Sequence, residues 1–141
     1  MPRNPKSEAR KQRVVSVLEM RTGPLVRKYQ NRDWYCTGES SVELFVTDSK
    51  DLWFDMADKD ITEFATHRAG FIIFVFGDVN SFVVIPAKDL EAHISEHDGP
   101  VSETGNFHFH LERNSFRELP HWNLQPYAQN LQLIDAATRR I

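Results

Sequence analysis

The apolar stretch Phe71–Phe76 (FIIFVF), followed after the segment Gly77–Asn80 by a second one, Ser81–Ile85 (SFVVI), decides the fold class. Apolar runs this continuous are typical of strands that are covered on both faces. The glycine, aspartate and asparagine between them predict a short turn and hence an antiparallel hairpin. Pro86 cannot donate a ladder hydrogen bond, so it ends the second strand. We therefore expect a central hairpin with helices packed against it.

Two short helices are predicted next to this hairpin. Asp60, with Glu63 three residues later, has the form of a helix cap with its reciprocal acid, which predicts a short helix that ends before Gly70. Pro86 suits the first turn of another helix, over Ala87–His97, because a first-turn residue needs no intrahelical N–H bond.

Further strands are predicted on both sides of the hairpin. Trp34–Thr37, Val42–Thr47 and Leu52–Met56 are rich in β-branched and aromatic residues and are separated by polar segments, which is typical of an antiparallel meander. Asn106–Glu112 alternates apolar and polar residues, which predicts a strand with one core face and one polar face.

The two ends of the chain complete the predicted architecture. Ser7–Met20 has an amphipathic helical pattern that Gly23-Pro24 ends, and Leu25–Tyr29 could add one helical turn. We predict a single α+β domain over 1–141, with a mixed, mostly antiparallel sheet of five to seven strands flanked by the N-terminal helix and two short helices. Its parts are a basic helix or arm (1–22), the α+β core (34–134) and a loose tail (135–141).

Composition restricts the class of protein. A chain of 141 residues with 40% hydrophobic and 26% charged residues is one globular domain that can bury its own core. The single cysteine, Cys36, excludes an internal disulfide framework and is typical of a reducing compartment. The longest apolar run is far shorter than the roughly 20 residues of a membrane-spanning helix. The first residues lack the apolar segment of a signal peptide, so we expect a cytoplasmic protein without a membrane partner.

Charge is distributed unevenly along the chain. Residues 1–33 carry nine basic and three acidic residues, a net +6, whereas the remainder carries eight basic and 17 acidic residues, a net −9. A basic segment on an acidic body favours contact with a nucleic acid, but a solvated helix or an acidic surface of a second copy, giving a homodimer, would also explain it. The predicted phosphate ligands are Arg3, Lys6, Arg10, Lys11, Arg13, Arg27 and Lys28, with His108 and His110 as secondary candidates.

Histidine spacing indicates a possible metal site. His93 and His97 lie four residues apart on a predicted helix, and His108 and His110 lie two apart on a predicted strand, so each pair shares a face. If the two elements touch, the four imidazoles could bind zinc. The segment His93–His97 also matches the H-x-x-E-H pattern of inverted zinc peptidases, although no third ligand on a later helix is evident. Surface histidines are the simpler interpretation.

Acidic residues indicate a second possible site, that of a metal-dependent nuclease. Such enzymes use an aspartate, then a D/E-x-K tripeptide on an adjacent strand, to hold magnesium or manganese near an attacking water. Asp33 and the tripeptide Asp48-Ser49-Lys50 match that pattern, with Asp33, Asp48 and Lys50 as candidate catalytic residues and Glu43 as an additional carboxylate. The same tripeptide followed by Asp51 is equally typical of a turn.

The segments Gly70–Gly77 and Phe82–Leu90, preceded by Leu52-Trp53-Phe54, resemble the distal half of bacterial restriction-endonuclease-like domains. Phe107–Leu111 and Leu124–Tyr127 resemble the end of bacterial domains linked to DNA restriction and modification. The resemblance covers residues 52–134 and lacks the family's metal-binding tripeptide in a predicted strand. It implies a nucleic-acid-handling fold whose active site is lost, altered or displaced.

These observations together predict a DNA-binding domain in a restriction or defence context, with a nuclease-like fold and an incomplete active site. A divergent metal-dependent nuclease and a homo-oligomeric interaction module are the alternatives.

Overall fold

The computed structural model describes residues 5–28, 33–37, 42–49, 52–66, 69–76, 81–96 and 105–139. Within these ranges, no helix has both the length and the apolar composition that a bilayer crossing requires. The elements, in chain order, are α1 (Pro5–Thr22), β1 (Leu25–Arg27), β2 (Trp34–Thr37), β3 (Glu43–Ser49), β4 (Trp53–Ala57), α2 (Asp58–Thr66), β5 (Gly70–Phe76), β6 (Phe82–Pro86), α3 (Ala87–Glu96), β7 (Asn106–Glu112), β8 (Ser115–Phe116), the 3-10 turn η1 (Gln125–Tyr127) and α4 (Gln132–Arg139).

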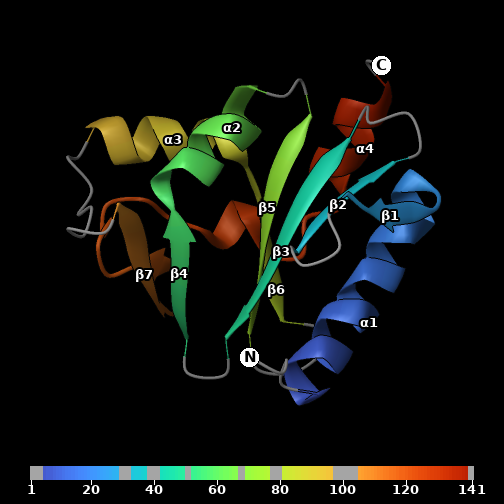
Figure 1. Cartoon of the computed structure of the whole chain (residues 1–141). Coiled ribbons are helices and arrows are strands. Elements are labelled where there is room, and N and C mark those ends of the chain that lie inside the picture. Colours follow the sequence, from blue (N-terminus) through green and yellow to red (C-terminus); the bar gives the residue numbers. More distant parts are fainter. Residues whose placement is uncertain are drawn as a thin grey trace.

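The main sheet has five strands in the order β1-β2-β3-β5-β6 (Figure 1). All neighbours are antiparallel except β3 and β5, which pair in parallel from Glu43 opposite Gly70 to Ser49 opposite Phe76. A parallel pair needs a crossover between its strands, and β4 and α2 supply it. The predicted central hairpin is confirmed as β5 and β6.

A second, three-stranded sheet holds β4, β7 and β8 in the order β4-β7-β8. The α+β class is therefore confirmed, but the strands form two sheets rather than one. The predicted meander holds for β2 and β3 and is wrong for β4, which pairs with β7 in the register Trp53 opposite His110. The physical reason is that β5 occupies the edge of β3 that β4 would need.

Two hydrophobic cores lie on opposite faces of the main sheet. On one face, α1 and α4 cover Leu44, Val46 and Ile73. On the other face, α2, α3 and the second sheet cover Ile72 and Phe74. Strand β5 is thus buried on both faces, as its uninterrupted apolar run predicts.

Three segments differ from the sequence-based expectation. Leu25–Arg27 forms the edge strand β1 instead of a helical turn, because Gly23, with a φ of +80°, ends α1 in the left-handed conformation that favours glycine. A loose tail is predicted from residue 135, but α4 extends to Arg139, and Ile134 within it is fully buried. Asp48 lies within β3 rather than in a turn.

Both edges of the main sheet are partly covered. At β1, the backbone N–H of Leu25 donates to Oε2 of Glu19 at 2.8 Å. At β6, the backbone N–H of Gln129 donates to the carbonyl oxygen of Phe82 at 2.9 Å. Covered edges oppose strand-to-strand association, so neither edge offers a long free ladder.

Candidate functional site

Helix α1 carries most of the predicted phosphate ligands, and it lies against the face of the main sheet (Figure 1). Val14, Val15 and Leu18 are buried there. The basic segment is therefore part of the core rather than an extended arm. Basic side chains on the inward side of α1 therefore contact the sheet rather than the solvent.

The two candidate catalytic carboxylates lie on the same face of the sheet. The backbone N–H of Val46 in β3 donates to the carbonyl oxygen of Asp33 at 3.0 Å, which places Asp33 opposite Val46, immediately before β2. Asp48 is two residues further along β3, so its side chain is on the same face. The two carboxylates therefore both lie on the side of the sheet that α1 covers.

Arg10 and Lys11 of α1 form ion pairs with these two carboxylates. The Arg10 guanidinium binds Asp48 with two hydrogen bonds, Nε to Oδ1 at 2.9 Å and Nη2 to Oδ2 at 2.7 Å, and the Asp48 side chain is only 1% exposed. Hydrogen bonding to Asp48 raises the pKa of Arg10 against the effect of burial. Nζ of Lys11 lies 3.1 Å from both oxygens of Asp33 and 3.5 Å from Oε1 of Glu8. The helix thus supplies the positive charge that balances both carboxylates.

Glu43 belongs to a separate ion pair on the opposite face. Its Oε1 accepts hydrogen bonds from Nζ of Lys28 at 2.7 Å and from Nε1 of Trp34 at 3.0 Å, and its side chain is 1% exposed. Because neighbouring residues of a strand alternate between faces, Glu43 points away from the face of Asp48. The structure therefore does not bring Glu43 together with the other two acids.

A third contact group surrounds the phenol of Tyr35. Nη2 of Arg27 donates to the Tyr35 oxygen at 2.7 Å and lies 3.7 Å from Oε2 of Glu8, and Nε2 of Gln12 donates to the same phenol at 3.0 Å. The Arg27 guanidinium also stacks 5.3 Å from the centre of the Tyr35 ring. Arg27 is therefore held between a carboxylate and an aromatic ring.

These ion pairs offset most of the positive charge of the N-terminal segment. Residues 5–28 hold seven basic and two acidic residues, and four carboxylates from elsewhere in the chain bind to them, which leaves a local surplus of one positive charge. The strong net charge of the segment is thus largely balanced within the fold. The four carboxylates are those of Asp33, Glu43, Asp48 and Asp135.

The remaining predicted ligands fall into two groups. Arg13 is exposed on α1. Arg3, Lys50 and His97 lie outside the described residues, as does the side chain of Lys6, so their predicted roles stay predictions.

The histidines lie away from α1. His108 is on the outer face of the second sheet, with Nδ1 3.6 Å from Oδ1 of Asp55, and His110 is half-buried beside it. Phe107 and Phe109 fill the inner face, as the alternating pattern predicts. The second sheet covers the face of the main sheet opposite to α1, so these histidines and the basic helix do not share a surface (Figure 1).

His93, the remaining described candidate ligand, stacks on Trp122 with ring centres 4.0 Å apart. In the part of the chain that the structure describes, no three His, Cys, Asp or Glu side chains gather as a metal ion would require. The stacked ring gives His93 a packing role.

Tyr127 lies next to this stack and has a perturbed phenol. Burial raises the pKa of Tyr127, a hydrogen bond with Trp122 lowers it, and the charge of Asp89 together with a 3.0 Å hydrogen bond to Asp89 raises it, for a net upward shift. An unfolded tyrosine loses its proton near pH 10, whereas folded Tyr127 keeps it to higher pH.

We expect the Tyr127 phenol to make stability fall as pH rises above about 10, because in that range the unfolded state binds fewer protons than the folded state. A Tyr127→Phe variant should lose this part of the alkaline decline and also the tyrosinate absorbance that appears above the ordinary pH range in a folded-state titration. A variant that keeps the late absorbance phase would contradict the assignment to Tyr127.

The contacts of Glu8 and of Arg10 are difficult to predict from the sequence. The only local cue to Glu8 is its spacing of three residues from Lys11, which brings the two side chains together on a helix. The pairing of Arg10 with Asp48 spans 38 residues and depends on how α1 docks, so spacing could not reveal it.

Neither a scan against models of known protein families nor a search among curated proteins finds a match to this chain, so the site rests on its own geometry.

Proposed function

We propose that the chain is a nucleic-acid-binding domain with a nuclease-like layout that does not cleave its ligand. One observation carries the non-cleaving part of the proposal: the side chains of Asp33 and Asp48 lie on one sheet face, but Lys11 and Arg10 occupy their oxygens. The resemblance of residues 52–134 to restriction-endonuclease-like domains, which implies a lost, altered or displaced active site, is the sequence-based reason for the nucleic-acid part of the proposal. The restriction or defence context remains part of this proposal.

The ion pairs limit which side chains can contact phosphates. Lys11 is buried, and Arg10 already makes two hydrogen bonds, so a phosphate would have to displace a carboxylate from either one. Exposed cations on the solvent side of α1 are better placed, and Arg13 is the described example. With few phosphate contacts, we expect binding to be weak at physiological salt and to depend on ionic strength.

Fluorescence anisotropy with a labelled DNA duplex and a labelled single strand tests the proposal. The full chain should bind at low salt, and Arg13→Ala should weaken binding and reduce the slope of log K against log salt by about 1. Lys88→Ala, an exposed cation on α3 across the sheet, is the matched control and should leave both quantities unchanged. Absence of binding at low salt would overturn the proposal.

The same experiment includes plasmid DNA with magnesium or manganese, where we expect no nicking. Nicking that disappears in Asp33→Asn and Asp48→Asn would establish the nuclease alternative instead. Self-association stays a prediction, for which Met20 and Val26, 83% and 53% exposed, are the apolar side chains best placed among the described residues.

A further inference from the structure

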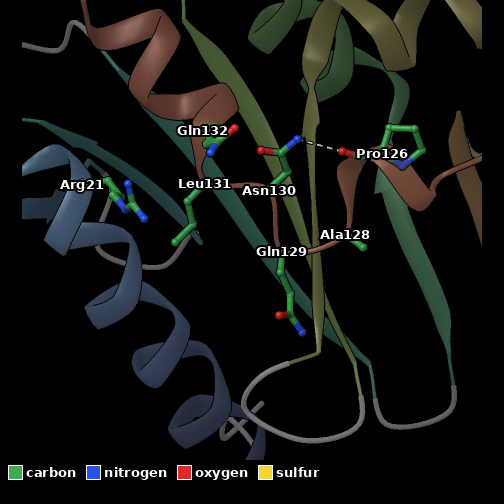
Figure 2. A pocket seen from close by; sticks show the side chains of 7 residues that line it. All are labelled: Arg21, Pro126, Ala128, Gln129, Asn130, Leu131 and Gln132. Carbon is green, nitrogen blue, oxygen red and sulfur yellow. Dashed lines mark hydrogen bonds between the residues drawn. The ribbon is translucent and has the colours of Figure 1, made fainter.

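A hollow of about 410 Å³ lies between the C-terminal end of α1 and the segment that leads into α4 (Figure 2). Its two sides are fixed to each other, since Nη1 of Arg21 in α1 lies 2.7 Å from Oδ2 of Asp135 in α4. Its floor is anchored to β6 by the backbone bond from Gln129 to Phe82. The lining residues are Arg21, Pro126, Ala128, Gln129, Asn130, Leu131 and Gln132.

Carboxamide groups dominate the polar lining of this hollow. Three of the seven lining residues, Gln129, Asn130 and Gln132, carry amides, each of which offers a donor and an acceptor. Nδ2 of Asn130 donates to the carbonyl oxygen of Pro126 at 2.8 Å, and Figure 2 shows its Oδ1 on the side away from Pro126. This bond fixes the orientation of the Asn130 amide.

The charge of the hollow is low. Arg21 is the one cation among its lining residues, and its ion pair with Asp135 offsets that charge. A neutral hollow with mixed donors and acceptors favours an uncharged polar ligand over a phosphate. Leu131 and Pro126 add apolar lining on opposite sides of the hollow.

We propose that the hollow holds an unstacked base of a nucleic acid. Asparagine and glutamine amides pair with the edge of adenine through two hydrogen bonds, and single-stranded bases are recognised by such edge contacts together with packing on their faces. The volume lies within the range of about 300 to 1,000 Å³ that is common for small-ligand sites. This inference rests on the proposed function and specifies that a base is the part of the nucleic acid that the hollow binds.

The test is a titration of the full chain with adenosine, monitored through the side-chain amide resonances in NMR spectra. Adenosine has no phosphate, so the titration reports on the hollow alone. Adenosine should shift the amide signals of Asn130 and Gln132, and Gln132→Ala should weaken its binding by at least about five-fold. Alanine is a good helix former, so this change preserves α4. Gln125→Ala, an exposed glutamine of η1 outside the hollow, is the matched control and should bind adenosine normally.

Three outcomes would overturn the inference: no amide shift at millimolar adenosine, equal shifts with ribose alone, or equal weakening by Gln125→Ala. The result is separable from the DNA titration above. DNA binding without adenosine binding overturns only the hollow as a base site, whereas adenosine binding without DNA binding supports the hollow and overturns the proposed function.

Discussion

Replacing Arg10 by methionine is expected to lower the free energy of unfolding by about 3–5 kcal/mol, the usual cost of removing one partner from a buried ion pair. The reason is the environment of Asp48, whose side chain is 1% exposed and receives two hydrogen bonds from Arg10. Methionine keeps much of the apolar stem but leaves this carboxylate without its Arg10 counter-charge. Urea denaturation at neutral pH measures the change.

Two further variants identify the cause of that loss. Arg10→Met combined with Asp48→Leu removes both charges and should recover much of the stability, because well-packed apolar residues often replace a buried pair at little cost. Arg13→Met changes an exposed cation one turn away on the same helix and should alter stability by less than about 0.5 kcal/mol. A loss below about 1 kcal/mol for Arg10→Met would show that the pair acts as a solvated surface bridge.

Phe74→Ala is expected to cost about 3–5 kcal/mol and to lower the melting temperature by more than about 10 °C. Phe74 in β5 is fully buried, and its ring centre lies 5.0 Å from that of Phe54, 5.1 Å from that of Phe116 and 5.9 Å from that of Phe109. These three rings come from the second sheet, so the truncation removes the contact that joins the two sheets.

A half-exposed aliphatic residue provides the comparison for Phe74. Val26→Ala, in the edge strand β1, should change the unfolding free energy by less than about 0.5 kcal/mol. If Phe74→Ala and Val26→Ala had similar effects, the aromatic cluster would not be the main link between the sheets.

Elements with a strong internal pattern were predictable from the sequence. The hairpin of β5 and β6 follows from two apolar runs around a turn, and β7 follows from strict alternation along Asn106–Glu112. In both cases the pattern depends only on neighbouring residues, because burial of one or both faces of a strand determines which of its positions are apolar.

Strand partners could not be predicted in the same way. A short strand such as β4 has the same composition whether it pairs with β3 or with β7, and only the position of β5 beside β3 decides between them. The three residues of β1 are likewise too few to show a period.

The candidate site was predictable in its residue types and not in its contacts. Asp33 and Asp48 were selected as candidates by their spacing, and their side chains lie on one face of the sheet. Their neutralisation by Lys11 and Arg10 depends on the docking of α1, because the contacting residues are 22 and 38 positions apart in the sequence.

The first and last helices of the chain cover the same face of the main sheet, with Val14 of α1 and Ile134 of α4 in one core. Because a chain is synthesised from its N-terminus, α4 leaves the ribosome after the other elements that form this face. A nascent chain that ends before α4 would expose part of that apolar surface throughout synthesis. We therefore expect this face of the sheet to be completed only once α4 has left the ribosome, with chaperones that bind apolar surface acting before that moment.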